Sequence, residues 1–397
     1  MLLRALRNLK LLLLLLLLFY TSRDLALIPF LDTLGVDLQN LYLFHHCSGA
    51  NNPYLLTGAQ CGDPFGRDMF YPPLMYFAFA WTRLVGFPFA TGIWAAFLGA
   101  SSLICLWAWL PSRVWRTLGG MRPWLLLLAL LAQYPMAFAI ERGNCDILPL
   151  IGWTLAFRLW LAERPAWSGF AAGAAVALKL YPAFACAIVA VGVLGVAIRE
   201  RKGWRTLAWF GLGGVAAPAL ALLAFLEQSK DYLRDELPRF AAQETGLTIF
   251  LHTLRALQPE RSWVFPVTSA CLFGCWAYAS FRHLRRDPAL VFAGALAMTT
   301  YFARTSYDYN LITAYPVLAL LALRALEGDG RVALKNLLLS GLGILVFFGG
   351  RRLCLVHHWA EQRIAAQLVW LCVAALLARR SSDVFGEWRS RESLPAS

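Results

Sequence analysis

The chain alternates long apolar runs with short polar turns. A helix needs roughly 20 apolar residues to cross the hydrocarbon core of a bilayer, so this pattern predicts about 12 membrane spans, within a range of roughly 11 to 13. A membrane β-barrel would show short segments of alternating polarity, which this sequence lacks. We therefore predict an all-α fold, a polytopic transmembrane helical bundle. The apolar windows fall near residues 11–29, 90–110, 123–140, 146–162, 168–180, 182–198, 204–226, 263–281, 288–303, 309–325, 332–349 and 362–378.

Two apolar segments at the start of the chain need separate treatment. The N-terminus, MLLRALRNLKLLLLLLLLFY, has the basic start and leucine run of a signal peptide. It lacks a convincing small-x-small cleavage site, and apolar character resumes at Leu25, so we expect an uncleaved first span. The segment 73–86 is apolar but short and contains Arg83. We expect it to lie at the membrane interface, or to dip into it, without crossing the bilayer.

Composition agrees with a membrane protein. The 397 residues are 59% hydrophobic and 15% charged, and their mean hydropathy is +0.57, whereas soluble domains are about 25% charged. The net charge of +13 would suit a nucleic-acid partner only if it formed a soluble basic face. The basic residues instead cluster between the apolar windows, so we expect the lipid bilayer, and no nucleic acid, as a partner.

The basic clusters predict an orientation. Cytoplasmic loops of membrane proteins are enriched in Lys and Arg, and a cytoplasmic N-terminus with alternating spans places four further basic clusters on the same side. This topology makes residues 1–380 one transmembrane domain and residues 381–397 a cytoplasmic tail. It places the loops 35–73 and 227–262 outside, together with the turns 141–146, 179–182, 304–310 and 351–358. The cytoplasmic clusters are Arg113/Arg116/Arg122, Arg199/Arg201/Lys202/Arg205, Arg282/Arg285/Arg286 and Arg379/Arg380.

The large polar loop 35–73 holds the first candidate for chemistry. Asp37 lies just after the first apolar window, where it can act as a general base or anchor a substrate hydroxyl, or be a solvated loop residue. For Asp63 and Asp68 there are two alternatives: a role on the side where an acceptor substrate binds, or a structural role. Most of the nine cysteines suit apolar helix positions. A disulfide between Cys47 and Cys61 of this loop is an open alternative.

The outer turns hold further candidates. The turn ERGNCD contributes Arg142, Asn144 and Asp146, more charge than a plain hairpin requires. Lys179 lies in an otherwise uncharged stretch that Pro182 interrupts, which indicates either a functional intramembrane lysine for an anionic phosphate or a snorkelling side chain. The turn RTSYDYN supplies Arg304, Asp308 and Asn310, which could instead form a structural salt bridge with Lys179.

No cofactor or metal site is predicted. The sequence contains no Walker A loop, GxGxxG fingerprint or HExxH motif, and its cysteines have no metal-type spacing. Adjacent residues do not share a helix face, which argues against a metal site formed by His357 and His358 alone. The donor or cargo is therefore expected in the membrane.

Four segments together resemble glycosyltransferase family 87 of the GT-C superfamily. They are GVDLQNLY after the first span, FYPPL at the end of the loop, the turn ERGNCDILPL, and the small-residue segment GAAVALKLYPA. The resemblance implies a polyprenol-phosphate-mannose-dependent α-mannosyltransferase with a GT-C-like bundle. Its expected location is the bacterial inner membrane, with the active site facing the periplasm.

The resemblance also implies roles for individual residues. Asp37 would be the general base of an inverting hexosyltransferase, and Lys179, with Arg142 or Arg304, would offset charge on the leaving polyprenyl phosphate. Some relatives carry histidines where this chain has SYDYN, so Asp308 is a second candidate base. The implied substrates are a polyprenyl-phosphate sugar donor and a glycan or glycolipid acceptor. The remaining substrate-binding candidates are Asn144, Asp146, Tyr71 and Tyr181.

Two other functions compete with this interpretation. A transporter or flippase of lipid-linked sugars would show internal repeats and polar residues at the membrane midplane, whereas no clear repeat is visible and the polar clusters fall on one predicted face. A non-catalytic assembly factor has little need for those outer clusters of acids and bases.

Overall fold

The protein is described by a computed structural model, which places residues 2–23, 34–47, 52–110, 121–200, 203–238, 264–302, 308–328, 330–349 and 360–377. Every regular element within these ranges is helical, which confirms the predicted all-α class. The long helices are α1 (Leu2–Ser22), α4 (Phe87–Ala108), α6 (Met121–Leu131), α7 (Tyr134–Arg142), α8 (Ile147–Leu161), α9 (Pro165–Leu178), α10 (Pro182–Arg199), α11 (Gly203–Ala224), α15 (Val264–His283), α16 (Pro288–Phe302), α17 (Tyr315–Glu327), α18 (Gly330–Phe348) and α20 (Ala360–Leu377).

Fewer of these helices can cross a membrane than the hydrophobic pattern predicted. Among the described residues, five are long and apolar enough for a span: α1, α4, α10, α11 and α18. The helices α6 and α7 add a sixth if the two count as one broken span. Others, including α8 and α9, are apolar but shorter. The structure thus supports an all-α membrane protein, while the predicted total of about 12 spans is not confirmed.

The predicted window 123–140 is not one straight helix. It divides into α6 and α7, which are bent by 60° at a short break. Pro135 occupies the first turn of α7, a position that proline tolerates because the amide there needs no helical partner. In the break, the side-chain amide of Gln133 donates hydrogen bonds to the carbonyls of Leu18 (3.0 Å) and Ala129 (2.8 Å). Its side-chain oxygen accepts one from the Thr21 hydroxyl (2.8 Å). These bonds tie the bend to α1.

Small residues allow α9 and α11 to pack closely. A side chain at Gly169 would meet the Phe210 carbonyl oxygen at 2.0 Å, and one at Gly173 would meet the Gly214 carbonyl oxygen at 2.3 Å. Helix pairs in membranes commonly use small residues in this way, because lipid offers little hydrophobic driving force and close backbone contact replaces it. This packing fixes the C-terminal end of α9, where Lys179 follows.

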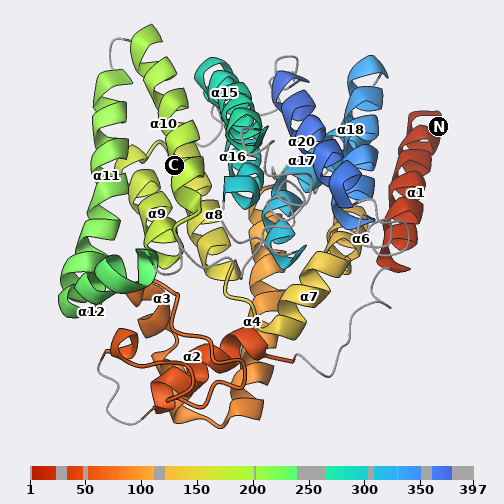
Figure 1. Cartoon of the computed structure of the whole chain (residues 1–397). Coiled ribbons are helices and arrows are strands. Elements are labelled where there is room, and N and C mark those ends of the chain that lie inside the picture. Colours follow the sequence, from red (N-terminus) through yellow and green to blue (C-terminus); the bar gives the residue numbers. More distant parts are fainter. Residues whose placement is uncertain are drawn as a thin grey trace, which may run out of the picture.

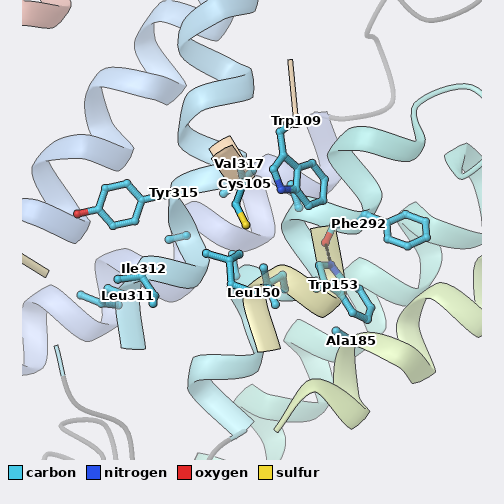
Figure 2. Packing of buried hydrophobic residues seen from close by; sticks show 14 of the residues in the cluster. Cys105, Trp109, Leu150, Trp153, Ala185, Phe292, Leu311, Ile312, Tyr315 and Val317 are labelled. Atoms are coloured by element: carbon cyan, nitrogen blue, oxygen red, sulfur yellow. Dashed lines mark hydrogen bonds between the residues drawn. The ribbon is translucent and has the colours of Figure 1, made fainter. Parts of the chain in front are cut away.

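Aromatic side chains connect the middle of the bundle. Trp153 of α8 donates a hydrogen bond of 2.8 Å to the carbonyl of Phe292 in α16 (Figure 2). Trp109, just after α4, stacks on Phe157 with ring centroids 4.2 Å apart. Its indole also donates to Thr154 at 3.1 Å. Buried indole groups need such partners, and these bonds join α4, α8 and α16 into one core.

Short helices and turns gather at one end of the bundle (Figure 1). They are α2 (Val36–His46), the 3-10 turn η2 (Pro53–Leu55), α3 (Pro73–Ala78), the 3-10 turn η3 (Ala80–Leu84), α12 (Leu226–Asp231) and the π-helical turn η4 (Tyr232–Glu236). Asn52 donates a hydrogen bond of 2.6 Å to Asp231, and Phe77 stacks on Phe225 at 4.2 Å. The first loop therefore packs against the start of the segment 227–262. Both α3 and η3 are too short to cross a bilayer, as expected for 73–86.

The ion pairs of the predicted cytoplasmic face lie at the opposite end of the bundle from these short helices and turns. The Arg285 guanidinium pairs with Glu200, just beyond the end of α10 that is farther from Lys179. Arg324, near the C-terminus of α17, pairs with Asp287, which precedes α16. Lys10 donates a hydrogen bond of 2.8 Å to the Gly328 carbonyl and so connects α1 to this region.

Candidate active site

Asp37 lies on a helix, where the sequence analysis expected a loop. The helix α2 begins at Val36, and Asp37 is in its first turn. A carboxylate is stabilised there by the free amides and the dipole of the helix N-terminus. Gly35 precedes the helix in the left-handed conformation (φ 71°), and its amide donates a hydrogen bond of 2.6 Å to the Glu141 carbonyl. This backbone bond connects the start of α2 to the turn 141–146.

A close approach of two glycines brings Arg142 to Asp37. Gly143 ends α7 with φ 66°, a conformation that costs little only for glycine. A Cβ at this position would lie 2.9 Å from Cβ of Leu38 and 3.3 Å from Cα of Gly35. Gly143 is therefore both the residue that ends α7 and the point where α7 contacts α2.

The Asp37 carboxylate lies between two guanidinium groups. Its Oδ1 accepts a hydrogen bond of 2.9 Å from Nη2 of Arg142 and lies 3.6 Å from Nη1 of Arg67. The residue is buried, with 6% of its surface exposed. Within the described part of the chain, its Oδ2 has no hydrogen-bond partner. One carboxylate oxygen is therefore fixed by cations, and the other is a buried acceptor with unused hydrogen-bonding capacity.

Lys179 takes its counter-ion from the turn 141–146. The lysine ends α9 in an extended conformation, just before Pro182 begins α10. Its ammonium donates a hydrogen bond to Oδ1 of Asp146, a residue 33 positions earlier whose side chain is fully buried. The Asp146 amide in turn donates a hydrogen bond of 2.7 Å to Oδ1 of Asn144. Among the described residues, the carboxylate partner of Lys179 therefore comes from the preceding turn.

Tyr71 joins the two ion pairs. The Lys179 ammonium lies 5.9 Å from the centre of the Tyr71 ring and 5.6 Å from that of Tyr181, distances suited to cation–π attraction. Burial raises the pKa of Tyr71 well above its usual range, and the negative charges of Asp37 and Asp146 add to this effect. The Tyr71 hydroxyl is thus a neutral hydrogen-bonding group close to both carboxylates.

Seven of the predicted site residues come together in this way: Asp37, Tyr71, Arg142, Asn144, Asp146, Lys179 and Tyr181. Arg304 lies outside the described residues, as do His357 and His358. Asp308 begins the 3-10 helix η6 (Asp308–Ala314), but the side chains of Asp308 and Asn310 are not described. Within the described ranges, no group of three or more His, Cys, Asp or Glu residues could hold a metal ion.

The sequence analysis missed Arg67 and Asn40, and it gave Asp63 an acceptor-side or structural role. The Arg67 guanidinium donates hydrogen bonds to the Val36 carbonyl and to Oδ2 of Asp63, both at 2.8 Å. Burial acts to raise the pKa of Asp63, but hydrogen bonds from Arg67 and Asn40 outweigh it and hold the pKa below its usual value. A lone arginine in an irregular loop carries no periodic signal that would point to this contact.

A disulfide between Cys47 and Cys61 closes the first loop. Cys47 follows the last residue of α2, so the bond fixes the C-terminal end of the helix, while Arg67 contacts its N-terminal end. Disulfides persist in oxidising compartments and are rare in the cytosol. This observation supports an extracytoplasmic location for the loop 35–73.

We expect replacement of Cys47 by serine to loosen the loop without unfolding the bundle. A disulfide that closes about 15 residues stabilises a fold by about 3 kcal/mol in the chain-entropy account, and here the gain concerns α2 and its loop. Limited proteolysis should cut this loop faster in the variant, and Cys186→Ser in α10 is the control. Maleimide labelling of the denatured, unreduced wild type should miss two cysteines; labelling of every cysteine would contradict the bond.

The sequence model of glycosyltransferase family 87 matches residues 70–326 of this chain. The chain belongs to glycosyltransferase family 87. The matched region contains Tyr71, Arg142, Asp146 and Lys179, and it begins after Asp37. No curated protein and no solved structure matches the chain. Family membership and the apolar helices identify a multi-pass membrane glycosyltransferase that acts on a sugar donor and an acceptor.

Proposed function

We propose that this glycosyltransferase moves a hexose, with mannose as the first candidate, from a polyprenyl-phosphate donor to a glycan or glycolipid acceptor. The observation that carries this proposal is the buried carboxylate of Asp37. Its Oδ2 is without a hydrogen-bond partner among the described residues, and it is close to the cations that a phosphate leaving group requires. A base and cations within one site suit transfer of a sugar from a phosphate to a hydroxyl group.

Asp37 serves as the general base in the proposed step. Its Oδ2 takes the proton from the acceptor hydroxyl while that oxygen forms a bond to the anomeric carbon. The bond between the anomeric carbon and the phosphate oxygen breaks, and its electron pair leaves with polyprenyl phosphate. The configuration at the anomeric carbon inverts, because the acceptor attacks from the side opposite the phosphate. Asp308 is the alternative base.

Lys179 and Arg142 offset the charge of the leaving phosphate. An ammonium has three hydrogen-bond donors, and a guanidinium has five. Lys179 directs one donor to Asp146, and Arg142 directs one to Asp37. These carboxylates hold the cations in place before the donor binds, so less reorganisation is needed as negative charge develops on the phosphate. Tyr71, Tyr181 and Asn144 complete the proposed substrate contacts, and Arg304 is a further candidate.

The proposed site faces the periplasm of a bacterial inner membrane. Two observations support this orientation: the loop beside the site contains a disulfide, and the ion pairs of Arg285 and Arg324 lie toward the opposite end of the helices. The positive-inside rule makes that opposite end cytoplasmic. We further propose that residues 1–380 form one GT-C-like domain and residues 381–397 a cytoplasmic tail.

A donor panel tests the proposed function. The purified protein would be given one of four tritium-labelled donors: polyprenyl-phosphate mannose, polyprenyl-phosphate glucose, GDP-mannose or UDP-glucose. Octyl mannoside and a membrane lipid extract would serve as acceptors. We expect transfer only from a polyprenyl phosphate. Use of a nucleotide sugar would contradict the proposed donor. Movement of the lipid-linked sugar across proteoliposomes without its consumption would instead identify a flippase.

A further inference from the structure

We propose that Arg67 is a positioning residue that orients the Asp37 carboxylate, with Asp63 and Asn40 as its supports. The inference rests on the proposed role of Asp37 as the base. It adds a second arginine to the site and explains why the first loop closes over the start of α2.

The Arg67 guanidinium is held from several directions. Its Nη2 donates to the Val36 carbonyl and to Oδ2 of Asp63, each at 2.8 Å, and its Nε donates to Oδ1 of Asp63 at 3.3 Å. The remaining nitrogen, Nη1, lies 3.6 Å from Oδ1 of Asp37. The Arg67 guanidinium, a planar fork of three nitrogens, is therefore fixed by its other contacts. Only Nη1 faces the Asp37 carboxylate. Lysine, with a single point of charge, cannot reproduce this arrangement.

Asp63 and Asn40 connect this fork to α2. Asp63 is buried, and its Oδ1 also accepts a hydrogen bond of 2.8 Å from the Phe65 amide. The Asn40 side chain donates to Oδ2 of Asp63 at 3.1 Å and to the Arg67 carbonyl at 2.9 Å. Asn40 is three residues after Asp37 on the same helix, so the two side chains lie on neighbouring parts of one face. These hydrogen bonds thus hold the loop against the first turn of α2.

The charges of this cluster explain how Asp37 remains a usable base. The negative charge of Asp63 offsets the positive charge of Arg67, and among the described residues Arg142 supplies the short hydrogen bond to Asp37. Without Asp63, the Arg67 fork would be free to engage both oxygens of Asp37, and Oδ2 would no longer be available to the acceptor. Among the described residues, the charged and titratable groups that interact with Asp37 include Arg67, Tyr71, Arg142 and Cys145.

The test is the pH dependence of the turnover number in three variants. The substrates are tritium-labelled polyprenyl-phosphate mannose and octyl mannoside. Arg67→Gln removes a cation near Asp37. The acid limb of the profile, where the turnover number falls as the pH decreases, should therefore move to higher pH. Asp63→Asn removes the charge that offsets Arg67, so the limb should move to lower pH. Arg67→Lys keeps the charge, so the acid limb of its profile should stay near that of wild type.

The size of the turnover number is the second readout. Misplacement of a catalytic group by about 1 Å can lower a rate by about 100-fold. We therefore expect the turnover numbers of the three variants to fall by about 10- to 100-fold, with the KM for the donor little changed.

Arg83→Gln is the matched control. It removes a positive charge at the same end of the protein, and Arg83 donates to the His45 carbonyl at 3.0 Å, near the other end of α2. Its acid limb should remain at the wild-type pH. Wild-type acid limbs in both Arg67→Gln and Asp63→Asn, with Asp37→Asn inactive, would overturn the positioning role alone. Full activity in Asp37→Asn would overturn the proposed base as well.

Discussion

Replacement of Asp37 by asparagine is expected to lower the turnover number for sugar transfer by about 100- to 10,000-fold, the range that a general base contributes. Asparagine has nearly the same shape, and its amide oxygen can still accept the hydrogen bond that Arg142 makes to Oδ1 at 2.9 Å. It cannot take a proton from the acceptor. Because Lys179 remains in place, the KM for the lipid-phosphate donor should change little. Initial rates with tritium-labelled polyprenyl-phosphate mannose measure both quantities.

Two further variants give this experiment its controls. Asp68→Asn makes the same substitution in the same loop, where Asp68 accepts a hydrogen bond of 2.9 Å from the Gly58 amide, and its turnover should stay within a few-fold of wild type. Asp308→Asn tests the other candidate base. An active Asp37→Asn together with an inactive Asp308→Asn would transfer the proposed role to Asp308.

Replacement of Arg324 by methionine is expected to lower the free energy of unfolding by about 3–5 kcal/mol, because it leaves a buried carboxylate without its cation. Arg324 donates two hydrogen bonds to Asp287, of 2.7 and 2.6 Å. Both side chains are buried, with 8% and 4% of their surfaces exposed. Asp287 also accepts a hydrogen bond of 3.1 Å from the Leu290 amide in the first turn of α16. Detergent-solubilised protein unfolded by increasing SDS provides the measurement.

The double variant Arg324→Met/Asp287→Leu separates the ion pair from simple packing. Apolar replacement of a whole buried pair is often neutral or stabilising, so much of the lost stability should return. The loss of the hydrogen bond to Leu290 should leave a deficit of about 1 kcal/mol, as for other helix caps. A single variant that unfolds at the wild-type SDS concentration would contradict the prediction. A double variant less stable than Arg324→Met would contradict it as well.

The hydrophobic pattern was sufficient to predict the helical class, because each apolar run is a local property of the chain. It also located the turns that supply Arg142, Asp146 and Lys179, since charged residues are costly inside an apolar segment. The number of spans could not be obtained in the same way. An apolar run can form a full span, a shorter buried helix such as α8, or a bent pair such as α6 and α7, and packing against neighbours decides between them.

The sequence by itself determined that this protein is a helical membrane protein and, through four short segments, that it resembles the family to which it belongs. Only the tertiary structure decided how the polar residues combine. Asp37 pairs with Arg142, 105 residues away, because Gly35 and Gly143 let α2 and α7 approach closely. Lys179 pairs with Asp146, and Arg67 reaches Asp37 from an irregular loop. Such contacts depend on where separate helices meet, which a local pattern of polar and apolar residues does not specify.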